Sequence, residues 1–258
     1  MPVNQPEPFQ IPQIPVANDL TLADLRDALA KGWADYKAQP LFGMFFALFY
    51  IVGGVALSWL LATRGSSIWL IPAASGFPLI APFTAVGLYE VSRRREAGLP
   101  LSWRAVLGAL RGRGDDQLLM IGGFVFVGFT FWMILAHGIF AIFMAESGVG
   151  GESLALFQST AGLGMLAVGT VTGSLMAFLF YAVTVISLPL LVDKDIDFLT
   201  AIIKSLRAVQ LNQMVMVMWA LTIGVTLFAA MVPAFLGLLV VLPVLGHATW
   251  HLYRRVVG

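Results

Sequence analysis

Long uncharged apolar stretches alternate along the chain with shorter segments in which polar and apolar residues follow a helical period. A run of about 20 apolar residues lets a helix cross a hydrocarbon core about 30 Å thick. The pattern therefore predicts an all-α polytopic membrane protein with six transmembrane helices. The predicted spans cover residues 41–61, 68–91, 118–144, 165–191, 214–230 and 232–253.

Two of these spans carry breaks that the sequence itself signals. We separate the last two at Met231–Pro233, because a single helix over both would be about 60 Å long, twice the thickness of the core. The second span contains Pro72, Gly76, Pro78 and Pro82. We expect a kinked or partly unwound start there, covered by protein rather than lipid.

A short amphipathic helix precedes each pair of spans. The first is capped by Asp19 or Thr21 and is too polar to span, so it fits a position in the plane of the headgroups. Its apolar positions are Leu22, Leu25, Leu29, Trp33 and Tyr36, and its opposite, polar face carries Asp24, Asp27, Lys31 and Asp35. The second starts after the candidate cap Ser102 and the third after Asp197.

These three helices align without gaps as an internal repeat, over Asp24–Phe42, Ser102–Met120 and Asp197–Val215. Each unit is predicted to be a cytoplasmic surface helix followed by a transmembrane hairpin, with units near 19–92, 100–192 and 195–255. Parallel repeats of this kind favour a pseudo-threefold arrangement. The alternative is that a shared amphipathic requirement creates part of the match.

Composition excludes a soluble domain. Hydrophobic residues make up 59% of the 258 residues and charged residues only 11%, against about a quarter charged in soluble domains. The absence of cysteine excludes disulfides and thiolate sites.

Residues 1–18, rich in Pro and Gln, are predicted to be a disordered or extended arm ahead of a single membrane domain, 19–258. The alternative is a docking strip in which Phe9, Ile11 and Ile14 touch a partner or a neighbouring face. The arm has no basic segment followed by an apolar run, so we expect the first span to direct insertion.

The basic residues predict the orientation. Placing the surface helices, the linkers and both termini on one side leaves Arg64 as the one basic residue opposite, among the 15 Lys and Arg. By the positive-inside rule both termini are cytoplasmic. The predicted interfacial anchors are Trp33, Trp103, Phe198, Lys204 and Arg207.

Two histidines on the last helix are the first candidates for chemistry. His247 and His251 are four residues apart, a spacing able to bind a metal. His137 lies about 20 residues into the third span, about 30 Å from the cytoplasmic surface, so the three cannot converge on a haem or copper centre. The pair is either a polar helix end or an interfacial proton or anion site that includes Glu90.

Glu90 and His137 each have two interpretations. Glu90 precedes Arg93 and Arg94 by three and four residues, which favours a local helical pair over a role in a site. His137 is ionisable and deep in a span, where a polar group needs a partner. It is therefore either a functional residue or a member of an interhelical hydrogen bond.

Other motifs fail on inspection. Asp193, Asp195 and Asp197 imitate a calcium loop, but Phe198 replaces its glycine and Lys204 its final glutamate; helix capping explains them. Gly148, Gly150 and Gly151 are not followed by the residues of a phosphate loop. We also expect no grouping of serine, histidine and acid on one side. The sequence therefore predicts no enzyme, no cofactor and no metal site.

The stretches VVLPVLGHATWHLYRRV at 240–256, LSWRAVLGAL, LYEVSRRRE and LPLLVDKDIDFLTAIIKSLRAV resemble the bacterial integral-membrane family DUF2189. The resemblance covers roughly residue 20 to the end, and GHATWHLYR is its most specific part. It implies a proteobacterial inner-membrane protein, and some members carry descriptions as cytochrome c oxidase subunits. A catalytic oxidase subunit would need several histidines on facing helices, which the three histidines here do not provide.

We expect a non-catalytic integral membrane protein, an accessory or assembly partner of a larger inner-membrane complex such as a respiratory oxidase. Its expected partners are membrane lipids and other membrane-protein subunits, with no nucleic acid. The alternative is a small-solute or lipid transporter with a path along the axis of the helix bundle. A midplane cavity would favour the transporter, and a bundle packed shut would remove its support.

Overall fold

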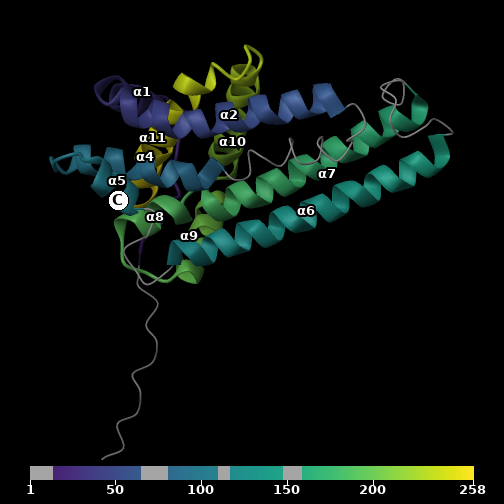
Figure 1. The fold of residues 1–258 in the computed structure, drawn as a ribbon. Helices are drawn as coiled ribbons and strands as arrows, with labels where there is room; N and C mark the ends of the chain where they lie inside the picture. The colour runs from purple at the N-terminus through teal and green to yellow at the C-terminus, as the bar shows by residue number, and fades with distance from the viewer. Residues whose placement is uncertain (1–13, 65–80, 110–116, 148–158) are drawn as a thin grey trace, which may run out of the picture.

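A computed structural model describes residues 14–64, 81–109, 117–147 and 159–258, and all the regular structure in these ranges is α-helical. Figure 1 shows α6 and α7 running side by side away from the other helices, which gather around α11. The helices are α1 (Leu22–Ala38), α2 (Pro40–Arg64), α4 (Ala81–Glu96), α5 (Trp103–Gly108), α6 (Gln117–Ser147), α7 (Thr160–Thr184), α8 (Ser187–Asp193), α9 (Phe198–Leu211), α10 (Gln213–Met231) and α11 (Leu238–Val257).

Four stretches in the described ranges are long and apolar enough to cross a membrane. They are Pro40–Leu60, Gln117–Phe143, Thr160–Asp193 and Gln213–Met231, and they match the first, third, fourth and fifth predicted spans. The prediction of an all-helical membrane protein is confirmed, but a count of six is not. The start of the second predicted span, with Pro72, Gly76 and Pro78, lies outside the described residues. The sixth corresponds to α11, which is not among the four.

The break between the last two helices falls where the sequence predicts it, but it is longer. Residues 232–237 separate α10 from α11, and Ala234 and Phe235 have positive φ angles of 50° and 65°. This backbone region is unfavourable for residues other than glycine. Packing supports it here, because the Phe235 ring lies against Gly54 of α2, where an added Cβ would come within 2.6 Å of the ring.

Side-chain caps begin all three predicted surface helices. The Thr21 hydroxyl accepts a hydrogen bond from the Asp24 main-chain N–H, while the Asp24 carboxylate accepts one from the Thr21 N–H. Ser102 and Asp197 cap α5 and α9. The repeat alignment places Asp24 at the position of the caps Ser102 and Asp197, but Asp24 is the third residue of α1 and closes a capping box instead of capping the helix.

The predicted faces of α1 also need correction. Its buried residues are Leu25, Ala28, Gly32 and Asp35, and this face packs along α11. Leu22 and Trp33, assigned to the apolar face, are 47% and 43% exposed. Small residues face α11 because they let the two backbones come close, and tertiary packing thereby overrides the amphipathic pattern. Asp35, assigned to the polar face, is only 7% exposed.

The N-terminal segment that enters α1 is fixed to the C-terminal half of the chain. The Asn212 side chain accepts a hydrogen bond from the Leu20 N–H (3.1 Å) and donates one to the Ala17 carbonyl (2.7 Å). The Ala17 N–H donates to the Val256 carbonyl and Lys204 Nζ donates to that of Ile14. Residues 14–20 are therefore docked, whereas residues 1–13 of the predicted arm lie outside the described ranges.

Replacing Asn212 with alanine should detach this segment. Two main-chain groups of the segment would lose their partners, and we expect the free energy of unfolding to fall by about 1–2 kcal/mol. Limited proteolysis in detergent should then cut before Thr21 faster than in the wild type. Gln210→Ala, on the exposed side of α9, is the control. Equal cleavage rates in both variants would contradict the assignment.

Candidate functional site

A cluster of polar side chains is buried where α1, α4 and α11 meet. Asp35 of α1 lies at its centre and its carboxylate has three partners. Oδ1 accepts a hydrogen bond from Arg95 Nη1 (2.6 Å), while Oδ2 accepts one from the Ser92 hydroxyl (2.6 Å) and lies 2.8 Å from Nε2 of His251. Buried carboxylates are stable only when paired and hydrogen-bonded in this way. The cluster therefore joins a surface helix to two helices of the bundle.

Ser92 extends the cluster to a second histidine. Its oxygen lies 2.8 Å from Nδ1 of His247, and both residues are fully buried. A serine has one hydroxyl hydrogen. Because that hydrogen is donated to ionised Asp35, Nδ1 of His247 must donate to the serine oxygen. His247 is thereby held as the Nδ1–H tautomer, and its Nε2 has no hydrogen-bond partner among the described residues.

The sequence analysis names the two histidines of this cluster as candidates but does not predict their partners. Asp35 was assigned to an exposed face, and Ser92 and Arg95 carry no motif. The expectation of no serine, histidine and acid grouping is wrong. The grouping differs from a catalytic triad, because the serine lies between the histidine and the acid, whereas a triad places the histidine between the other two. Within the described ranges no three His, Asp or Glu side chains are placed to share a metal.

Glu90 lies outside this cluster. Its carboxylate accepts hydrogen bonds from Nε and Nη2 of Arg93 and from Nε of Arg94, all 2.7 Å long. The two salt bridges join residues three and four positions apart, the spacing at which helical side chains meet. The structure thus has the local pair that the sequence favours, and it does not bring Glu90 to the histidines.

The remaining predicted residues are dispersed. His137 is half-buried on α6, away from the α1, α4 and α11 junction. Trp33 lies beside Tyr36 with the two rings tilted and is 43% exposed, and Trp103 packs on Phe42 with ring centroids 4.3 Å apart. Among the other predicted anchors, Phe198 is half-buried at the start of α9, Lys204 binds the Ile14 carbonyl, and Arg207 lies beside residues 14–16.

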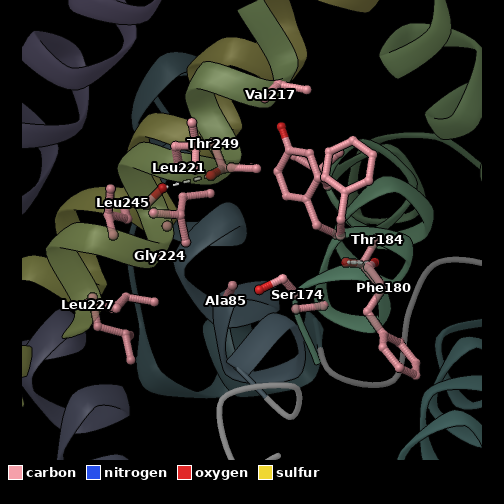
Figure 2. A pocket seen from close by; sticks show the side chains of 18 of the residues that line it. Ala85, Ser174, Phe180, Thr184, Val217, Leu221, Gly224, Leu227, Leu245 and Thr249 are labelled. Carbon is pink, nitrogen blue, oxygen red and sulfur yellow. Dashed lines mark hydrogen bonds between the residues drawn. The ribbon is translucent and has the colours of Figure 1, made fainter. Parts of the chain in front are cut away.

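A second candidate site is an apolar groove of about 410 Å³ between α4, α7, α10 and α11. Its floor is made of buried residues of α4 and α11, including Tyr89, Leu242 and Leu245. Its walls are the candidate spans α7 and α10, whose residues at the edge, such as Leu221, are exposed. Figure 2 shows Leu221 and Thr249 on one side of the open space and Thr184 on the other, while the ring of Phe180 points away from the space.

Among the described residues that line the groove there is no charged or histidine side chain. Its polar lining consists of five hydroxyls, three of which already donate to main-chain carbonyls: Tyr181 to Met216 (2.8 Å), Thr184 to Phe180 (2.7 Å) and Thr249 to Leu245 (2.8 Å). Tyr89 and Ser174 provide the other two. The lining suits a neutral, mainly apolar molecule.

The cluster and the groove share helix α11. On α11, Leu245, Gly246 and Thr249 line the groove while His247 and His251 point into the polar cluster. The cluster therefore fixes the position of the helix that forms the floor.

These features define the class: an all-α integral membrane protein with at least four helices able to span and a groove between them. The family model DUF2189, described as a predicted integral membrane protein, matches residues 70–193 of the chain. The sequence-based prediction of the family is confirmed there, although GHATWHLYR lies beyond the matched range. Comparison with curated proteins and with solved structures gives no match.

Proposed function

We propose that this protein is a non-catalytic membrane protein that holds one apolar chain of a membrane lipid in the groove between α7 and α10. The main observation that supports this proposal is the groove, which is about 410 Å³ in volume, apolar and open at the side. Lining residues Val217–Leu227 cover the middle of α10, so the groove faces the hydrocarbon core if α10 spans. A chain can enter such a groove sideways from the bilayer. This supports lipid binding over a path for a polar solute.

The proposed topology keeps six spans in three hairpins with both termini in the cytoplasm of a bacterium. Four candidate spans and the clustering of basic residues support it. The repeat and the pseudo-threefold arrangement remain part of this proposal. Because the chain has no cysteine, single cysteines placed at Ser102 and Ser159 should be labelled by an impermeant thiol reagent from opposite sides. Labelling of both from one side would refute it.

We further propose the accessory role, in which the lipid-loaded protein sits beside other subunits of an inner-membrane complex. Native purification in mild detergent, followed by identification of associated proteins and lipids, tests both parts. If a defined lipid co-purifies without protein partners, the lipid-binding function is supported and the accessory role is refuted.

Filling the groove should weaken lipid binding. Gly224 lines it, and an added Cβ there meets no atom within 4 Å, so Gly224→Leu places a side chain in the groove without a clash of its Cβ. We expect lipid retained per protein to fall roughly tenfold, the equivalent of about 1.4 kcal/mol. Mass spectrometry of lipids that remain after detergent exchange measures this.

Gly138→Leu on α6 is the matched control, because its Cβ also meets nothing within 4 Å and it lies outside the groove. Both variants gain the same helix propensity. Equal lipid retention in the two would contradict the proposed function.

A further inference from the structure

Tyr89 places an unused hydrogen-bond donor in the floor of the groove. Its side chain is only 4% exposed and lines the groove, and no hydrogen bond of its hydroxyl is found among the described residues. The other tyrosine of the groove, Tyr181, differs because it donates to the Met216 carbonyl at 2.8 Å. A hydroxyl left without a partner in an apolar medium costs about 1–3 kcal/mol. Within a bilayer, where water is scarce, the partner has to come from the molecule in the groove.

The lining restricts what that partner is. None of the lining residues that the structure describes is Asp, Glu, Lys, Arg or His, so a charged group would be desolvated there without a counter-charge, which is strongly unfavourable. An amine or hydroxyl of the occupant is not required, because the unused protein groups are donors that need an acceptor. A neutral carbonyl oxygen meets both conditions.

The position of Tyr89 suits the carbonyl of an acyl ester. Tyr89 precedes Arg93 by four residues on α4, about 6 Å along the helix axis. Arg93 and Arg94 mark the polar end of α4. A carbonyl bonded to Tyr89 would lie about one helical turn inside that end, and the attached chain could extend past Leu221 to Leu227 on the apolar wall of α10.

We propose that Tyr89 recognises the occupant of the groove by donating a hydrogen bond to an acyl carbonyl, so that the site selects ester-bearing chains over plain hydrocarbon. This rests on the proposed function, since it names the ligand chemistry of the same groove. Ser174, the second unused hydroxyl, lies on the exposed wall of α7 and is not required for this selection.

Photo-crosslinking in phosphatidylcholine nanodiscs tests the proposal with two probes of equal chain length and the same diazirine, one a methyl ester and one a hydrocarbon. Labelling of groove peptides from α4, α7 and α10 is measured by mass spectrometry and divided by labelling of exposed α6, which corrects for partitioning. One hydrogen bond of about 1 kcal/mol predicts a preference for the ester of about fivefold in the wild type.

Tyr89→Phe should reduce this preference to about one while hydrocarbon labelling of the groove is retained. Tyr181→Phe is the matched control and should keep the preference, because its hydroxyl is already committed to Met216. A wild-type preference of one, or a preference that survives in Tyr89→Phe, would overturn the role of Tyr89 and leave lipid binding intact. Groove labelling no higher than that of α6 with either probe would instead overturn the proposed function.

Discussion

Asp35→Ala is expected to lower the free energy of unfolding by about 3–5 kcal/mol, the usual loss when one partner of a buried charge pair is removed. The reason is the position of Asp35, which accepts hydrogen bonds from Arg95 and Ser92 and lies 2.8 Å from His251. Without it, Arg95 loses its ion-pair partner and Ser92 its acceptor. The change in the free energy of unfolding is measured by titration with mixtures of mild and denaturing detergent, with circular dichroism to monitor the loss of helix.

Asp27→Ala is the control on the same helix. Asp27 pairs with Lys31 at 2.8 Å, but their side chains are 62% and 56% exposed. Exposed pairs contribute about 0–1 kcal/mol, so this variant should unfold almost as the wild type does. If the two variants are equally stable, the buried cluster does not hold α1 in place.

The same carboxyl predicts a pH dependence. Burial by itself would raise the pKa of Asp35, but the hydrogen bonds from His251 and Ser92 and the electrostatic effect of both histidines outweigh it, so its pKa lies below the ordinary 3.8. A lowered folded-state pKa adds stability above the unfolded-state value and loses it as the pH falls through the folded-state value. The stability difference between wild type and Asp35→Asn should therefore shrink as the pH falls below about 3.8.

Gly32→Val is expected to have the second largest effect, a loss of about 3 kcal/mol, at the upper end for overpacking. A Cβ at Gly32 would lie 2.6 Å from the Ala248 nitrogen and 2.7 Å from the Val244 oxygen. Both are backbone atoms of α11, so no side chain can move to make room. The helices would have to separate, and Asp35, one turn along the same face, would move away from His251.

Gly169→Val on α7 provides the comparison, because a Cβ there meets nothing within 4 Å. The two changes have the same intrinsic effect on a helix, so their difference reports the α1–α11 contact. We expect detergent titration to show the loss for Gly32→Val alone. If Gly32→Val retains the stability and pH profile of the wild type, close packing of α1 on α11 is not needed for the cluster.

The sequence by itself determined the class of protein, the helix caps and the ion pairs between residues close in sequence. Runs of about 20 apolar residues predict spans because an unpaired backbone is costly in lipid, and four of the six predicted spans are candidate spans in the structure. The caps Ser102 and Asp197 and the Glu90 pairs with Arg93 and Arg94 were predictable too. Each depends on residues at most four positions apart, where helical geometry fixes the neighbours.

Only the tertiary structure decided the partners over long sequence separations. Asp35 and His251 are 216 positions apart, and an acid on an amphipathic helix looks the same whether its face meets water or α11. The buried face of α1 depends on the backbone approach at Gly32, and the groove depends on how α4, α7, α10 and α11 pack. Helical periodicity specifies which residues share a face, but not which helix that face meets, because that depends on how side-chain shapes fit together across the whole chain.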